Sequence, residues 1–234
     1  MAAATILPLA TAVRLCHGSA MIANTHTLKV LRRELGLALA GHAAFDGWTI
    51  TALDRAADDV GVSRDEARLV IGTSPSALID AFFAAVGDRL EQRLAEAALP
   101  ELKVRQRVRT GVVILLDLLV PHKEAVRRAS ALLPLHGPRA AGRLWRLADS
   151  IWHAAGDTAV DYNHYTKRLI LGGVIGTTLL AWLGDQSDAH SETLAFLDRR
   201  IAGVMRFETV KARGVAALSR LPDPAAFLGR LRYR

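Results

Sequence analysis

Apolar side chains recur every three or four residues over long parts of the chain, which is the spacing of an α-helix with one buried face. This pattern predicts a first helix over residues 25–43, which the sequence FDGW ends, and another helix over 76–97. The apolar positions of the two stripes are Leu28, Leu31, Leu35 and Leu39, and Leu78, Phe82, Val86 and Leu90. Because Ala and Leu dominate and β-branched runs are short, the fold is predicted to be all-α.

The segment between these two helices has the layout of a helix-turn-helix. We expect Thr51 to cap one helix, Gly61 to adopt the left-handed conformation of the turn, and Ser63 to cap a second short helix. Residues 25–98 are therefore predicted to form a three-helix unit of the helix-turn-helix type.

The charge of this unit argues against nucleic-acid binding. Residues 45–93 carry five Arg against nine Asp and Glu, a net charge of −4. The second short helix also begins with two carboxylates, Asp65 and Glu66. Affinity for DNA depends on neutralising phosphates, so no nucleic-acid partner is expected.

The pattern beyond Pro100 predicts a larger helical domain over residues 101–207. Its helices are expected at about 102–119, 121–133 and 138–154, with PLHGPR (134–139) as a helix breaker before the last of these. Trp145 and Trp152 lie seven residues apart in that last helix. Core packing is the preferred interpretation of the two tryptophans, and the alternative is that they border an apolar cavity or a partner surface.

The polar stretch AGDTAVDYNHYTKR (155–168) follows this helix. Asp161 and His164 have the i, i+3 spacing of metal ligands in helical bundles, but a second copy of the spacing and any Glu-x-x-His are missing from the sequence. The preferred interpretation is a helix junction in which Gly156 ends one helix and Asp157 caps the next. Neither a metal site, a cofactor nor a catalytic group is predicted.

An uncharged stretch, 169–184, comes next. It is shorter than the roughly 20 apolar residues that span a bilayer. Gly172 and Gly176 lie four residues apart, which lets another backbone approach closely. We therefore predict a buried helix here.

Composition sets further bounds. The 234 residues are 51% hydrophobic, which is enough for a sizeable core. The net charge of +7 is uneven: residues 1–100 carry −2 (9 Lys and Arg against 11 Asp and Glu), and residues 101–234 carry +9 (21 against 12).

The single cysteine, Cys16, excludes an internal disulfide. Residues 1–20 contain no acidic side chain and are expected to be disordered, a transit-like segment or a start placed too early, with Met21 as the alternative beginning.

Residues 144–205 resemble a known family. The family pattern is W-x-x-AGD-x-x-x-D-x-N-W-Y-T-(K/R)-R, then T-x-L, D-x-S and F-L-x-x-R-I. It is that of the accessory lipid-binding proteins of ubiquinone (coenzyme Q) biosynthesis. The matching positions are Trp152, Ala155, Gly156, Asp157, Asp161, Asn163, Tyr165, Thr166, Lys167, Arg168, Thr178, Leu180, Asp185, Ser187, Phe196, Leu197, Arg200 and Ile201. The chain departs from the family with His164 and Leu194 at tryptophan positions and an aliphatic residue near Ile175.

The resemblance implies a TetR-like fold, a homodimer and lipid binding in an apolar pocket. It also implies assistance to the di-iron hydroxylase that acts on demethoxyubiquinone, without catalysis by the chain itself. The helices of 144–183 are expected to line the pocket, and 160–207 to form the dimer. The predicted pocket residues are Trp145, Ile151, Trp152, Leu169, Ile170, Gly173, Ile175 and Leu179. The predicted partner-binding residues are Asp157, Asp161, Asn163, Tyr165, Lys167 and Arg168.

The C-terminal segment 208–234 is predicted to hold a basic amphipathic helix. Residues 204–234 carry seven Lys and Arg against two acidic residues. Such a helix can lie at a membrane interface, and the alternative is that it covers its own domain. The predicted membrane-binding residues are Phe227, Leu228, Arg230, Leu231 and Arg232.

Together these features predict a non-enzymatic protein that binds a quinone, isoprenoid or phospholipid and presents a demethoxyubiquinone-type intermediate to a hydroxylase. Its expected place is the cytoplasmic face of a bacterial inner membrane, as a peripheral protein, or the mitochondrial matrix side if residues 1–20 are a transit peptide. Two alternatives remain open: a TetR-type transcriptional regulator with a small apolar effector, and a metal-dependent helical-bundle enzyme.

Overall fold

The computed structural model describes the backbone of residues 9–157 and 162–218, and in this part of the chain every regular element is helical. The all-α prediction is therefore confirmed. The α-helices are α1 (Leu9–Asp46), α2 (Ile50–Val60), α3 (Arg64–Ile71), α4 (Pro75–Glu96), α5 (Val104–Leu119), α6 (Lys123–Ala131), α7 (Leu133–Ala154), α8 (Tyr162–Gly184) and α9 (Ser191–Leu218). Three short 3-10 helices join them, η1 (Leu99–Glu101), η2 (Val120–His122) and η3 (Asp188–His190).

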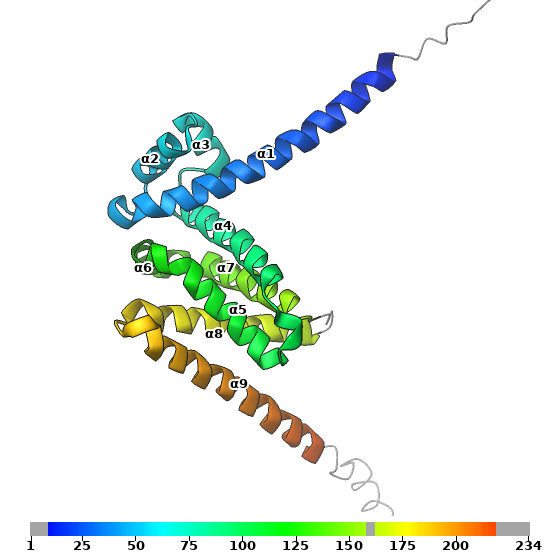
Figure 1. Cartoon of the computed structure of the whole chain (residues 1–234), viewed down its shortest axis with the longest axis vertical. Helices are drawn as coiled ribbons and strands as arrows, with labels where there is room; N and C mark the ends of the chain where they lie inside the picture. The colour runs from blue at the N-terminus through cyan, green and yellow to red at the C-terminus, as the bar shows by residue number, and fades with distance from the viewer. Residues whose placement is uncertain (1–8, 158–161, 219–234) are drawn as a thin grey trace, which may run out of the picture.

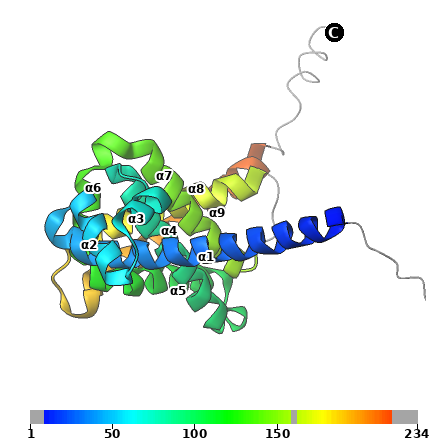
Figure 2. The same cartoon turned by 90° about the horizontal axis from the view of Figure 1, so that it is seen from above.

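Figure 1 shows two groups of helices connected by α4. Helices α2 and α3 pack on the C-terminal half of α1, and α4 runs from this group to α5 and α7. Helices α5 to α9 form the second group, with α9 on its outer side. Seen from above, the first part of α1 projects beyond the rest of the fold (Figure 2).

The first group is held by a close crossing of α1 and α4. The predicted stripe of α4 is buried throughout, at Leu78, Phe82, Val86 and Leu90. The stripe of α1 is buried only in its second half: Leu35 and Leu39 are in the core and Leu31 packs against it, whereas Leu28 is exposed. Gly36 permits the crossing, because a Cβ at this position would lie 2.7 Å from the carbonyl oxygen of Ala81. The buried Trp48 then connects the two groups by donating from Nε1 to the carbonyl oxygen of Ala125 at 3.0 Å.

The helix-turn-helix forms with one change of cap. Gly61 has φ of 77°, and the hydroxyl of Ser63 accepts from the Glu66 amide at 3.2 Å, as predicted. The cap of α2, however, is Thr49 and not Thr51, since the Thr49 hydroxyl accepts from the Ala52 amide at 3.3 Å. The helix begins one residue before Thr51, because Gly47 adopts φ of 71° and turns the chain directly before the buried Trp48.

Two predicted boundaries differ from the structure. Helix α1 begins at Leu9 and not at residue 25, in a segment that contains no proline after Pro8. The predicted breaker PLHGPR lies inside α7, which begins at Leu133 and includes Pro138. Pro138 is the sixth residue of α7, so it removes the intrahelical hydrogen bond to the carbonyl of residue 134, and the helix continues past it.

Candidate functional site

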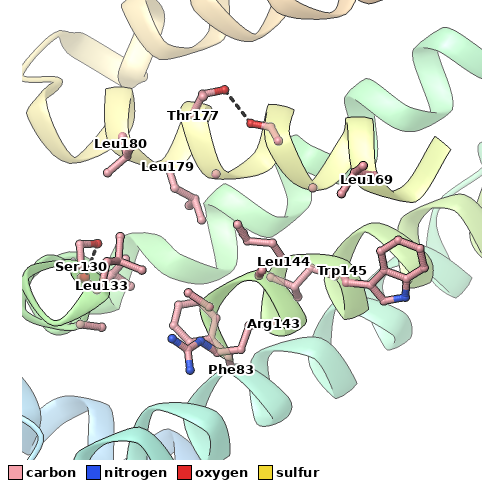
Figure 3. Close-up of a pocket in the computed structure, with 18 of the residues that line it drawn as sticks. Phe83, Ser130, Leu133, Arg143, Leu144, Trp145, Leu169, Thr177, Leu179 and Leu180 are labelled. Carbon is pink, nitrogen blue, oxygen red and sulfur yellow. Dashed lines mark hydrogen bonds between the residues drawn. The ribbon is translucent and has the colours of Figure 1, made fainter. Parts of the chain in front are cut away.

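An apolar cavity of about 420 Å³ lies between α6, α7 and α8, with Phe83 of α4 on its far side (Figure 3). Its volume is within the range of cavities that hold small-molecule ligands. The lining residues are Phe83, Val126, Ala129, Ser130, Leu133, Ala140, Ala141, Arg143, Leu144, Trp145, Leu147, Arg168, Leu169, Gly172, Gly173, Gly176, Thr177, Leu179 and Leu180.

Glycines of α8 create this space. A Cβ at Gly172 would lie 3.7 Å from the backbone of Leu144, and one at Gly176 would lie 3.0 Å from the Leu144 Cδ1 atom. Gly172 thus leaves room for a Cβ at ordinary contact distance, and the close approach that the spacing predicted occurs at Gly176, against the Leu144 side chain. Gly173, in contrast, faces open space, with nothing within 4 Å of the Cβ position.

The cavity opens to the surface beside two leucines of α8. Leu169 and Leu180 line it, and their exposed fractions are 70% and 56%. Tyr165, one turn before Leu169, is also exposed, and its ring lies 6.0 Å from that of Trp145 in the cavity wall. An apolar ligand could therefore enter without unfolding of the helices.

Few polar side chains border the cavity. The hydroxyl of Ser130 donates to the Val126 carbonyl, and that of Thr177 to the Gly173 carbonyl, each within its own helix. The two charged groups, Arg143 and Arg168, are both buried. Arg143 donates to Asp80, and Arg168 to Asp149 and Asp157.

The predicted pocket residues fall into two sets. Trp145, Leu169, Gly173 and Leu179 line the cavity. The other four, Ile151, Trp152, Ile170 and Ile175, do not line it. Ile151 and Ile175 are buried in the core, and Ile151 lies against Gly111 of α5. Trp152 lies about two turns beyond Leu144 on α7, and its Nε1 donates to the Lys167 carbonyl at 3.1 Å.

The polar stretch between α7 and α8 forms an ion-pair network. Gly156, with φ of 86°, ends α7 as predicted. Asp157 accepts from Lys167 Nζ at 2.6 Å and from Arg168 Nη1 at 3.1 Å, and Arg168 Nε donates to Asp149 at 2.5 Å. The Asp157 carboxylate binds these two side chains, and its predicted capping of the next helix involves residues 158–161, which lie outside the described part of the chain. The network ties the start of α8 to the end of α7.

The other predicted partner-binding residues differ in their surroundings. Asp157 and Arg168 are committed to contacts within the chain, and Lys167 also lies 5.4 Å from the Trp152 ring. Tyr165 faces solvent. Asp161, the side chain of Asn163 and the predicted membrane-binding residues Phe227, Leu228, Arg230, Leu231 and Arg232 lie outside the described parts of the chain.

Sequence analysis missed Arg107 of α5, which braces the same junction. Its guanidinium donates to the carbonyl oxygens of Leu102 at 2.8 Å, Ala155 at 2.9 Å and Pro100 at 2.9 Å. It thereby satisfies the C-terminal end of α7 from a different helix. Basic residues alternate along 103–109, and nothing in the sequence distinguishes Arg107 from the others.

The D-x-S pattern at Asp185 and Ser187 lies in the turn between α8 and η3, ahead of α9. Hydrogen bonds from the side chain of Ser187 and then of Thr193, with both backbone amides, hold the pKa of the Asp185 carboxyl well below its usual range. Lys123 Nζ donates to the Asp185 carbonyl at 2.8 Å. These contacts orient α9 relative to α8 and α6.

The helix-turn-helix arginines are paired with carboxylates of the preceding helix. Arg64 donates to Asp58 at 2.8 Å, and Arg68 donates to Asp54 at 2.7 Å. Both contacts reduce the positive charge that α3 offers to a phosphate. Among the side chains that the structure describes, no three of His, Cys, Asp or Glu come together as metal ligands.

Helix α8 has the length and composition of a membrane span between His164 and Gly184, with a mean hydropathy of 1.2. Half of this stretch is buried inside the fold, as in a core helix. Its contacts with α7 and α9 account for that burial.

Comparisons with known proteins place these features in a family. Residues 137–208 match the COQ9 family model. "Ubiquinone biosynthesis protein COQ9, mitochondrial" from Rattus norvegicus is 34% identical over 198 residues, which cover 79% of this chain and 63% of that protein. The Homo sapiens protein of the same name is 32% identical, with 79% and 62% covered. The chain thus spans less than two thirds of the length of these relatives.

A solved structure shows the same fold. The TetR transcriptional regulator from Nitrosomonas europaea superposes with a TM-score of 0.56 at 23% identity, covering 74% of this chain and 96% of that one. The predicted TetR-like architecture is confirmed by this similarity. The resemblance to the ubiquinone biosynthesis family is confirmed as well, and the chain is a homologue of the COQ9 proteins.

Proposed function

We propose that the chain is a non-enzymatic accessory protein of ubiquinone biosynthesis that binds a quinone or isoprenoid lipid in the cavity between α7 and α8. The observation that carries this proposal is the apolar, open cavity beside the glycines of α8. The names of the relatives supply the pathway, since they are ubiquinone biosynthesis proteins.

The physical reason for such a protein lies in the substrate. A polyprenylated quinone is too apolar to leave a bilayer, and each CH₂ sheltered from water is worth about 0.8 kcal/mol. A cavity with leucines at its mouth lowers the cost of partial extraction. We propose that the lipid passes to a partner hydroxylase at this mouth, where Tyr165 and Leu169 are exposed.

We further propose that the protein works as a homodimer at a membrane surface, with the 160–207 region in the dimer and residues 208–234 on the lipid. The relatives are named as mitochondrial. Of the two membranes that the sequence left open, these names fit the matrix side of the mitochondrion.

Native mass spectrometry of the purified protein, followed by solvent extraction and lipid identification, tests the central proposal. A dimer that carries a quinone, an isoprenoid or a phospholipid is the expected result. Loss of lipid in a Gly173→Phe variant, whose ring would enter the open space of the cavity, would assign the ligand to this site.

The matched control is Gly41→Phe. Gly41 is an exposed helical glycine of α1 with open space at its Cβ position, and it lies outside both the cavity and the proposed dimer region. If both variants lose lipid equally, or if Gly173→Phe keeps it, the lipid does not occupy this cavity. Bound duplex DNA in place of lipid would favour the TetR-type regulator instead.

The membrane role is tested with the full chain and vesicles that contain anionic lipid. A double substitution, Phe227→Glu and Leu231→Glu, is expected to reduce vesicle binding while lipid in the cavity is retained. Unchanged binding would mean that these residues do not contact the membrane.

A further inference from the structure

Arg143 gives the cavity one charged group with unused hydrogen-bonding capacity. It lies on the α4 side of the cavity beside Phe83 (Figure 3), and its side chain is 6% exposed. A buried guanidinium is costly unless its donors are satisfied. In a mostly apolar wall, the Arg143 guanidinium therefore needs hydrogen-bond acceptors.

The partner of Arg143 satisfies only part of the guanidinium. Nη1 donates to Asp80 Oδ1 at 2.6 Å, and the group lies 5.7 Å from the Phe83 ring centroid. An arginine side chain has five N–H donors, and within residues 9–157 and 162–218 this is the one hydrogen bond that Arg143 makes. Arg168, the other guanidinium of the cavity, binds two carboxylates and the His164 carbonyl.

The charge around Arg143 restricts the ligand. Because Asp80 already neutralises the guanidinium, a phosphate or carboxylate would bring a second negative charge close to the Asp80 carboxylate. Like charges repel more strongly in a partly buried site than in bulk water. A carbonyl or ether oxygen accepts a hydrogen bond without adding charge, and a hydrogen bond from a charged donor is among the strong ones.

On this basis, and resting on the proposed lipid-binding function, we infer that Arg143 binds an uncharged oxygen of a ring-bearing lipid, such as a quinone carbonyl, and that the cavity disfavours anionic lipids. The oxygenated ring lies at the α4 side, and the apolar chain passes Gly173 toward the exposed Leu169 at the mouth. The lipid then has to move outward before its ring reaches a partner.

Three probes with the same ten-carbon chain test this inference: decylubiquinone, decylbenzene and decyl phosphate. Binding to the full-length protein is measured by titration calorimetry. Wild-type protein is expected to bind decylubiquinone most tightly and decyl phosphate most weakly. Arg143→Met, which keeps the aliphatic stem and removes the donors, is expected to weaken decylubiquinone about tenfold, the loss typical of a hydrogen bond to a charged group, and to leave decylbenzene unchanged.

A double variant, Arg143→Met with Asp80→Asn, removes the buried charge along with its partner and serves if the single variant unfolds. The inference is overturned if decyl phosphate binds wild type more tightly than decylubiquinone, or if the substitutions weaken decylbenzene and decylubiquinone alike. If wild type binds none of the three probes, the proposed lipid-binding function itself fails.

Discussion

Arg168 Nη1 donates to Asp157 Oδ2 at 3.1 Å, and the two side chains are only 4% and 6% exposed. This buried ion pair joins the first turns of α8 to the residue that follows the end of α7. Since α7 and α8 form two walls of the cavity, the pair positions the cavity mouth. Asp157 and Arg168, two polar residues of the family pattern, thus have a structural role, because they hold α8 to the end of α7.

The pair predicts a difference between two aspartates that bind the same arginine. Asp157→Asn removes a buried charge from Arg168 and is expected to lower the free energy of unfolding by about 3 kcal/mol, the range for breaking a buried pair. Asp149→Asn is expected to cost about 1 kcal/mol or less, because the Asp149 side chain is 51% exposed. Urea denaturation of both variants measures the difference, and equal losses would contradict the assignment of Asp157 as the principal partner.

Two glycines predict opposite responses to the same substitution. A Cβ at Gly36 would lie 2.7 Å from the Ala81 carbonyl oxygen, so Gly36→Ala forces α1 and α4 apart. We expect a loss of about 1–3 kcal/mol in stability, as for other overpacked sites. Gly172→Ala meets the Leu144 backbone at an ordinary 3.7 Å, and the higher helix propensity of alanine, worth up to about 1 kcal/mol, should make it neutral or stabilising. Thermal unfolding of the two variants, compared with wild type, checks both signs.

Local signals in the sequence were the ones that predicted structure correctly. Gly61 and Ser63 bond to residues three or four positions away, and the turn and cap depend on little else. Thr49 and Thr51 are equally good caps by residue type. The choice between them depends on the burial of Trp48, whose Nε1 donates to Ala125, a residue 77 positions away, and the sequence does not show such a contact.

The candidate site was predicted in part for a related reason. The spacing of Gly172 and Gly176 indicated a close approach to another helix, and the structure shows it at Gly176. The spacing could not tell which side of α8 faces a cavity and which faces the core. Leu179 therefore lies in the cavity wall, and Ile175, equally apolar, lies in the core. The contacts of Arg107 span up to 48 residues, so they depend on tertiary packing alone.

Asp185 predicts a local change at the start of α9. Asp185→Ala removes the acceptor of the Ser187 and Thr193 amides. Amide hydrogen exchange at Thr193 is therefore expected to become faster, while exchange in α4, which makes few contacts with this turn, stays unchanged. Mass spectrometry of peptic fragments after exchange measures both regions. Unaltered protection at Thr193 would show that the backbone of α9 does not depend on the carboxylate.

His122 predicts a dependence of stability on pH. Its ring lies 5.4 Å from the Phe82 ring, and burial lowers the pKa of the imidazole below its usual value of about 6.5. The folded state therefore holds His122 neutral at a pH where the unfolded chain already binds a proton.

Stability should fall as the pH drops below about 6.5, with a slope that cannot exceed about 1.4 kcal/mol per pH unit for one proton. In His122→Gln the denaturation midpoint should depend less on pH between 7.5 and 5.5 than in wild type, whereas His153→Gln, at an exposed position, serves as the control. An identical pH dependence in wild type and His122→Gln would assign the titration to another group.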